Sequence, residues 1–251
     1  SIKKGSKMSE LLTLQQIEDS KIYQKEGIAY SHPMQIAEPF FNAFGRNDYL
    51  VKVDREVTNI NDNGTKNISY GRILLQKIFG TGEINATVGM IIAFDVQQIK
   101  LFAGANVSAC TNLCVFNPAW LVNTKIGIRL QSHVDNLEDI LQHKLDFDKE
   151  INRMNLSFLS KDNVHKLHSQ MILEHRKSKD KALYGESFTN KAFADLLMPD
   201  SKSPYAIEGE STSEWNVYNA LTQQLSDSKD ILYVPSKSFE AYEMIKNLTI
   251  N

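Results

Sequence analysis

The spacing of apolar residues changes near residue 130, and this change constrains the fold more than any other feature of the sequence. Before it, short segments rich in Val, Ile and aromatic residues predict β-strands. After it, apolar residues recur at steps of three and four, which is typical of amphipathic helices. The sequence therefore predicts an α+β fold, in which helices from the second half pack on one face of an antiparallel meander sheet from the first half.

The length of 251 residues allows one hydrophobic core that needs neither a metal nor a disulfide. We therefore expect a single domain over residues 1–251. Within it we expect short N-terminal helices over 1–48, the antiparallel sheet over 49–130 and a helical part over 131–251. The chain lacks alternating βαβ units, so a doubly wound nucleotide-binding fold is not expected.

A β-hairpin is the clearest local signal in the first half. Residues 49–60 alternate between Val and charged residues, and Asn63-Gly64 is the strongest short signal for a hairpin turn. Residues 65–79 are expected to form the return strand, with Gly71 as a candidate bulge. The stretch 72–78 is also compatible with one or two helical turns, and the strand is favoured. Further strands are expected at 84–94, 99–105 and 106–116, with an edge strand at 120–128.

Apolar residues that recur every three or four positions predict the helices. The N-terminal part is expected to hold short helices within residues 9–27 and 35–45. In the second half, residues 132–159 read as one long helix because their apolar stripe is unbroken. The remaining helices are expected at 162–176, from 189 or 190 onward, from 213 onward and at 239–248.

No catalytic or cofactor motif is present. Gly80-Thr81-Gly82 lies between strands, and a dinucleotide fingerprint needs a strand before it and a helix after it, so we expect a plain turn and no cofactor. His165, His168 and His175 share a helix, but their spacing does not match a known metal motif, so no metal is expected. Whether the chain is an enzyme stays open, and a non-catalytic role is favoured.

The cysteines and the apolar segments indicate the cellular compartment of the protein. Cys110 and Cys114 lie four apart on an expected strand, roughly 13 Å from each other, which is too far for a disulfide. Free thiols suit a reducing compartment. No segment resembles a signal peptide, and the most apolar run, 88–94, is too short to span a membrane. We expect a cytoplasmic protein with no membrane partner.

Basic residues on the expected strands point to nucleic acid. Residues 46–130 hold nine Lys or Arg and six Asp or Glu, whereas 131–251 hold fourteen and nineteen. A sheet with basic and aromatic side chains can follow a single strand by charge and base stacking. The alternative is that the aromatic residues are core and the charges are ordinary surface. The candidate nucleic-acid-binding residues are Lys52, Arg55, Lys66, Arg72, Lys77 and Lys100.

Two segments resemble a known group of sequences. Lys100–Phe116 and Glu214–Thr222 resemble a strand and a C-terminal helix of the uncharacterised phage/plasmid-like protein families, domains of unknown function carried by bacteriophages, plasmids and conjugative elements. The matching positions include Cys110, Asn112 and Trp215, for which we expect structural roles.

The resemblance implies a mobile-element protein in the cytoplasm of a bacterial host. In that setting we expect a non-catalytic accessory protein that handles DNA by single-strand binding or annealing, with self-association into a homo-oligomer. The alternative is a protein-binding antagonist or regulator of host defence, whose partner is a host protein.

Overall fold

The first half of the chain folds into one curled antiparallel sheet. The computed structural model describes residues 10–25, 28, 30–107, 112–142, 145–177, 185–198, 200–226 and 230–249. The strand order is β1-β3-β4-β5-β6-β7, with β8 also paired to β6 and β2 paired in parallel to β4. The bounds are β1 Glu10–Leu12, β2 Lys21–Ile22, β3 Tyr49–Ile60, β4 Lys66–Phe79, β5 Ile84–Ala93, β6 Gln98–Val107, β7 Asn112–Cys114 and β8 Leu121–Lys125.

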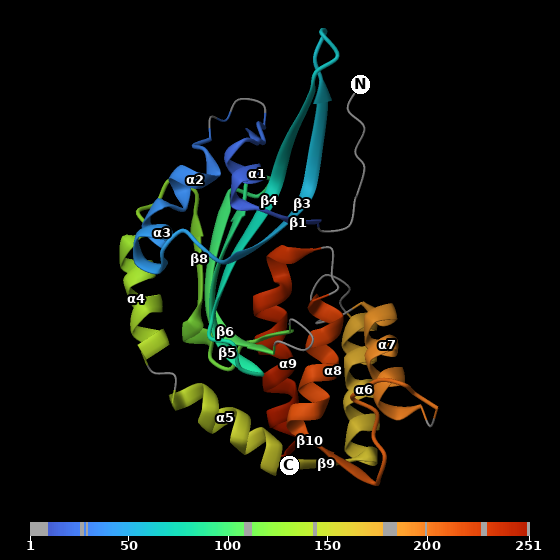
Figure 1. The fold of residues 1–251 in the computed structure, drawn as a ribbon. Coiled ribbons are helices and arrows are strands. Elements are labelled where there is room, and N and C mark those ends of the chain that lie inside the picture. The colour runs from blue at the N-terminus through green and yellow to red at the C-terminus, as the bar shows by residue number, and fades with distance from the viewer. Residues whose placement is uncertain are drawn as a thin grey trace.

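The predicted hairpin is confirmed, and it projects beyond the rest of the sheet (Figure 1). Asn61 closes its turn, because the Asn61 side chain accepts from the Thr65 amide at 2.7 Å and its carbonyl accepts from Gly64 at 2.9 Å. Gly64 has a φ of 75°, which suits glycine. The turn is therefore specified by local chemistry, as the sequence indicated.

The hairpin bends where Arg55 lies opposite Gly71. Arg55 has a φ of 56°, and a Cβ at position 71 would lie 2.8 Å from its own Cβ. Pairing resumes in the same register beyond this point, so no residue is inserted and the bulge expected at Gly71 is wrong. Glycine is needed instead for the close approach of the arginine. Beyond the bend, β2 replaces β5 as the neighbour of β4.

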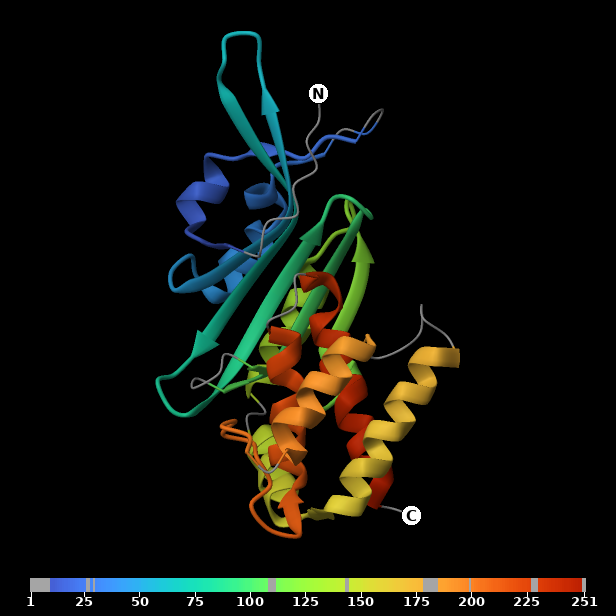
Figure 2. The ribbon, with the colours of Figure 1, turned by 90° about the vertical axis from the view of Figure 1, so that its right-hand side faces the viewer.

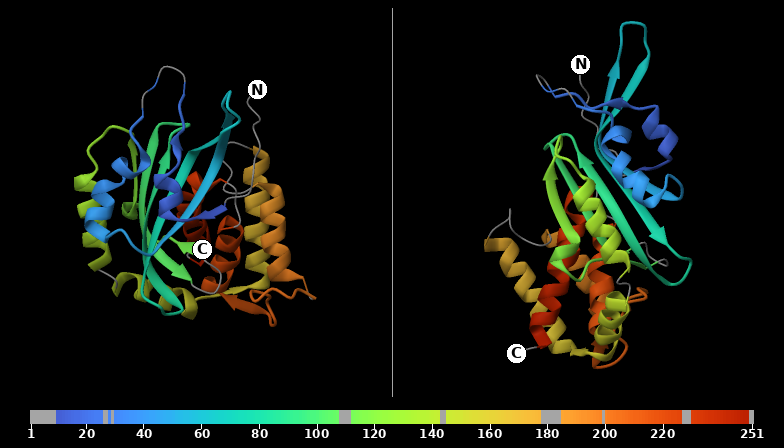
Figure 3. Two further views of the ribbon diagram at one scale, coloured as in Figure 1. Left: turned by 45° about the horizontal axis from the view of Figure 1, so that its top comes forward. Right: turned by 90° about the vertical axis from the view of Figure 1, so that its left-hand side faces the viewer.

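Helices cover both faces of the sheet, rather than one face as expected (Figures 2 and 3). Helices α8 and α9 pack against β7 on one side, whereas α3 and α4 lie together on the other, where α4 also contacts β5 and β6. The α+β class, with second-half helices on the sheet, is confirmed. The helix bounds are α1 Leu14–Glu18, α2 Pro33–Ile36, α3 Glu38–Phe44, α4 Gln131–Gln142, α5 Leu145–Leu156, α6 Lys161–Lys177, α7 Glu186–Leu197, α8 Glu214–Ser226 and α9 Val234–Thr249, with 3₁₀ turns η1 Pro118–Trp120 and η2 Ile231–Tyr233.

The long helix expected over 132–159 is wrong in its extent. The chain instead forms α4 and α5, and residues 158–160 form a strand, β9 (Phe158–Ser160), paired with β10 (Ser211–Ser213). α5 packs against α8, where Arg153 lies 2.8 Å from the buried carboxylate of Glu214. An unbroken apolar stripe cannot reveal this change of partner, because both helices use the same spacing.

The N-terminal segment also differs from its expected helices. Its described residues 10–25 form β1, α1 and β2 in succession rather than one helix. Thr13 begins α1, and its side chain accepts from the Gln16 amide while Gln16 caps Thr13 in return. No helix in the described part of the chain is long and apolar enough to cross a membrane.

Candidate nucleic-acid interface

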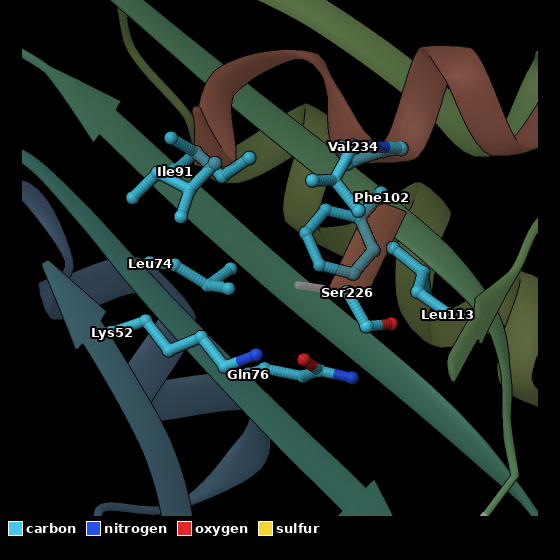
Figure 4. Close-up of a pocket in the computed structure, with 10 residues that line it drawn as sticks. Lys52, Leu74, Gln76, Ile91, Phe102, Leu113, Ser226 and Val234 are labelled. Carbon is cyan, nitrogen blue, oxygen red and sulfur yellow. The ribbon is translucent and has the colours of Figure 1, made fainter. Parts of the chain in front are cut away.

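The six basic residues predicted from the sequence do not form one surface. One row of paired residues crosses the sheet from β3 to β6, on the face that η2 and α9 cover. It consists of Lys52, Leu74, Ile91 and Lys100. Figure 4 shows Lys52 extending toward Gln76 in a pocket closed by Val234 and other apolar residues. The pocket has about 20 Å³ of free space, which is room for little more than one water molecule. It is too small for a nucleotide.

Arg72 is the centre of a buried charge cluster. Its guanidinium group is bidentate with Asp95, with distances of 2.9 and 3.0 Å, and its Nη1 lies 2.5 Å from Asp230. Asp54 completes the cluster, with its Oδ1 3.9 Å from Arg72 Nε. The Arg72 side chain is only 5% exposed. A guanidinium held by three carboxylates is not available to a phosphate.

Burial dominates the electrostatics of Asp54. It raises the pKa of this carboxyl to about 6, although the Ile231 amide donates to Oδ2 at 3.1 Å and the charge of Arg72 opposes the shift. The Asp54 Oδ1 atom accepts no hydrogen bond from any described residue. The cluster links β3, β4 and the β5–β6 turn to η2, and its role in the fold is to hold the start of α9 against the sheet.

The other predicted residues are scattered. Arg55 is half-exposed at the rim of the same cluster, 3.7 Å from Asp95 and 3.8 Å from Asp230. Lys100 lies 5.0 Å from the Tyr233 ring, and burial lowers its pKa. Lys77 is on the opposite face, where its amine donates to the Phe44 carbonyl. Of the six, Lys66 alone is both exposed and clear of the charge cluster, near the hairpin tip.

Replacing Lys52 and Arg55 by glutamate would be the direct test of a DNA surface on this sheet, but the positions of both residues rule it out. Lys52 lines the small pocket under η2, and Arg55 borders the acidic cluster. A glutamate at position 52 would place a negative charge in a small, mainly apolar pocket, and one at position 55 would add negative charge beside Asp95 and Asp230. We therefore expect the pair of substitutions to disturb the fold, so that they cannot test a DNA surface.

The family-like positions that the structure describes lie between the sheet and α8. Asn112 is fully buried in β7, and its amide donates to the Asn219 carbonyl at 3.1 Å. Trp215 packs beside Phe116 and Tyr218. Cys110 lies outside the described residues, whereas Cys114 is a buried thiol that forms no disulfide. Both contacts tie α8 to the sheet.

The two weaker motifs have ordinary surroundings. Gly80-Thr81-Gly82 forms the turn between β4 and β5, where the Asn85 side chain accepts from Gly82 N at 2.9 Å. His168 stacks on Phe193 and lies 2.9 Å from the Asn190 amide oxygen. Within the described residues, no three His, Cys, Asp or Glu side chains come close enough to hold a metal ion.

A groove that sequence reasoning missed lies between the N-terminal segment and the projecting hairpin. Its volume is about 470 Å³. The residues that line it are Ser20, Lys21, Ile22, Tyr23, Gln24, His32, Val57, Asn59, Asn67 and Ser69. They include one cation, one phenol ring and three carboxamides, and none of these ten is acidic. The groove is therefore polar, open and free of carboxylates along its described wall.

Pairing between distant segments builds this groove. β2 pairs in parallel with β4, with Lys21 opposite Ser69, which brings the N-terminal segment beside the hairpin. On the hairpin, Asn59 lies directly opposite Asn67. Val57 and Ser69, two residues away on each strand, face the groove in the same way because side chains alternate along a strand.

Two acidic residues close to the groove in the sequence, Glu18 and Asp19, contact other side chains. Glu18 lies 3.5 Å from Arg46, and Asp19 accepts from the Gln15 amide at 3.1 Å. Two exposed lysines flank the lining residues, because Lys25 follows Gln24 and Lys66 precedes Asn67. The sequence did contain a signal for the groove, because Asn59 and Asn67 flank the Asn-Gly turn. Side chains alternate between the two faces of β3 and β4, so both asparagines could have been assigned to one polar face.

No family model matches the chain, and no curated protein or solved structure matches it significantly. The resemblance of Lys100–Phe116 and Glu214–Thr222 to phage/plasmid-like families therefore stays a prediction. The function must be argued from the residues of the groove.

Proposed function

We propose that this protein binds single-stranded DNA in the groove between its N-terminal segment and the β3–β4 hairpin, as a non-catalytic DNA-handling protein. The observation that carries the proposal is the composition of the groove wall, where Lys21 and Tyr23 join three carboxamides and none of the ten described lining residues is acidic. Cations that follow the backbone and a ring on which a base stacks are what single-strand binding requires.

The positions of the lysines support entry of the DNA strand into the groove from the side of the hairpin. Lys66, which the sequence already singled out, stands exposed next to Asn67, and Lys21 and Lys25 stand exposed on the facing segment. Three lysines around one groove can contact phosphates from two sides. The setting of a phage or mobile element in a bacterial cytoplasm rests on the resemblance alone, and self-association stays a prediction.

The test is fluorescence anisotropy of a labelled single-stranded oligonucleotide with the purified chain at low and moderate salt. We expect affinity that falls as salt rises, with a logarithmic slope of about −0.7 for each phosphate contact. Lys21→Glu with Lys66→Glu should weaken binding at least about tenfold and flatten this slope. The matched control, Lys166→Glu with Lys202→Glu, makes the same charge change at exposed lysines on other parts of the chain and should have a much smaller effect.

Two results would overturn the proposal. If no DNA binds at micromolar protein and low salt, DNA handling is wrong, and an interaction with a host protein becomes the function to pursue. If the control pair weakens binding as much as the groove pair, the DNA is attracted by overall charge and the groove is not its site.

A further inference from the structure

We propose that the groove takes one unpaired nucleobase, adenine in preference to the others, with the Tyr23 ring against its face and the Asn59 and Asn67 amides at its edge. This inference rests on the proposed function and adds which part of the strand enters the groove. A site of this kind contacts the bases of the strand, whereas a purely electrostatic surface contacts only its phosphates.

The two asparagines form a fixed pair of hydrogen-bonding groups. Asn59 and Asn67 are directly opposite on β3 and β4, where facing Cβ atoms lie about 4.5–5.5 Å apart. Neither side chain bonds to another residue that the structure describes. Each carboxamide therefore offers a carbonyl oxygen and an NH₂ group toward the groove. The backbone ladder on both sides, from Val57–Ser69 to Ile60–Lys66, holds them in place.

Two further polar side chains of the wall, His32 and Ser69, are already engaged in hydrogen bonds. The His32 ring accepts from the Met34 amide at Nδ1, and its Nε2 lies 3.3 Å from the Ser20 carbonyl, to which it donates. Ser69 is buried, and its hydroxyl is directed at the Val57 carbonyl at 3.5 Å. These side chains shape the groove, and the amides are left to recognise what enters it.

Carboxamides match the edge of a base better than they match a phosphate. An amide pairs with adjacent donor and acceptor atoms, as Asn and Gln do with N6 and N7 of adenine. A base presents its face to an aromatic ring only when it is unstacked from its neighbours, which is the rule in single-strand recognition. The volume of about 470 Å³ lies in the range of small-ligand pockets, about 300–1,000 Å³, so the groove suits one nucleotide.

The experiment compares three labelled 12-mers of equal charge in the same buffer: oligo-dA, oligo-dT and an abasic strand with the same number of phosphates. We expect oligo-dA to bind about tenfold more tightly than the abasic strand, with oligo-dT between them. Asn59→Leu with Asn67→Leu keeps the side-chain size and removes the amides, so it should abolish the preference for oligo-dA.

Two controls keep the result specific. Asn123→Leu makes the same change at an exposed strand position on β8, away from the groove, and should leave the preference intact. Circular dichroism and the thermal midpoint of each variant establish that the hairpin has folded. Tyr23→Leu, which removes the ring, should reduce the affinity for oligo-dA and leave that for the abasic strand unchanged.

The outcomes separate the two levels of the proposal. If the abasic strand binds as tightly as oligo-dA, the base site is wrong while single-strand binding stands. If all three strands fail to bind, the proposed function fails and the base site fails with it. If the asparagine variant keeps its preference for oligo-dA, bases are recognised elsewhere and the inference is overturned.

Discussion

Asp54 Oδ1 lies 3.9 Å from Arg72 Nε, yet it accepts no hydrogen bond from any residue that the structure describes. Three carboxylates, those of Asp54, Asp95 and Asp230, surround the two guanidinium groups of Arg72 and Arg55. When all are ionised the cluster carries one excess negative charge. Because Asp54 is the most buried of the three acids, it is the one that gains most from holding a proton.

This relationship predicts a pH-dependent stability. The pKa of Asp54 is raised from 3.8 to about 6, so the folded state binds its proton more tightly than the unfolded state does. The contribution of Asp54 to the free energy of unfolding should therefore be fully present below about pH 4 and fall by up to about 3 kcal/mol as pH rises through about 6. Asp54→Asn should remove this fall, as denaturant titrations of both proteins at several pH values would reveal. Parallel pH curves for the two proteins would contradict the prediction.

Removing the cation should be far more damaging. Arg72→Met leaves three carboxylates around a buried site without their principal counter-charge, and we expect a loss of about 3–5 kcal/mol in the free energy of unfolding at pH 7. The matched control is Arg55→Met, at a side chain that is 55% exposed, with an expected loss below about 1 kcal/mol. Equal losses measured by urea denaturation would show that burial does not set the importance of these two arginines.

A third prediction concerns the contact between β5 and β6. A Cβ at Gly89 would lie 2.0 Å from the Phe102 ring, which covers this glycine from the neighbouring strand. Gly89→Ala should displace the ring and cost about 1–3 kcal/mol in the free energy of unfolding. Gly185→Ala is the control, because nothing lies within 4 Å of its Cβ position and its φ of −64° suits alanine. An unchanged thermal midpoint for Gly89→Ala would refute this packing argument.

Local signals predicted the parts of the fold that local chemistry determines. The hairpin at Asn61–Gly64 and the strands that follow it were found because alternation and turn residues act over a few positions. The start of α8 was found for the same reason, since Ser213 caps it by accepting from the Asn216 amide at 3.1 Å. The division of residues 132–159 was missed because one stripe served two helices with different partners.

The candidate sites depended on contacts that sequence spacing does not contain. Arg72 lies in an alternating strand, where an exposed position is the reasonable expectation. Its three carboxylates come from positions 54, 95 and 230, so its burial became visible only when these segments were brought together. The groove was missed because its two walls meet through the short parallel pairing of β2 with β4, which has no sequence signature.

The covering of the sheet by α8 and α9 has a consequence for synthesis on the ribosome. The last strand of the main sheet, β8, ends at Lys125, whereas the helices that cover Leu74, Ile91 and Phe102 extend to Thr249. At about 5–20 residues per second, translation leaves this apolar face uncovered for roughly 6–25 seconds. During that interval the nascent chain exposes an apolar surface of the kind that chaperones bind. The yield of native protein in a cell should therefore depend on how quickly α8 and α9 are synthesised and pack on the sheet.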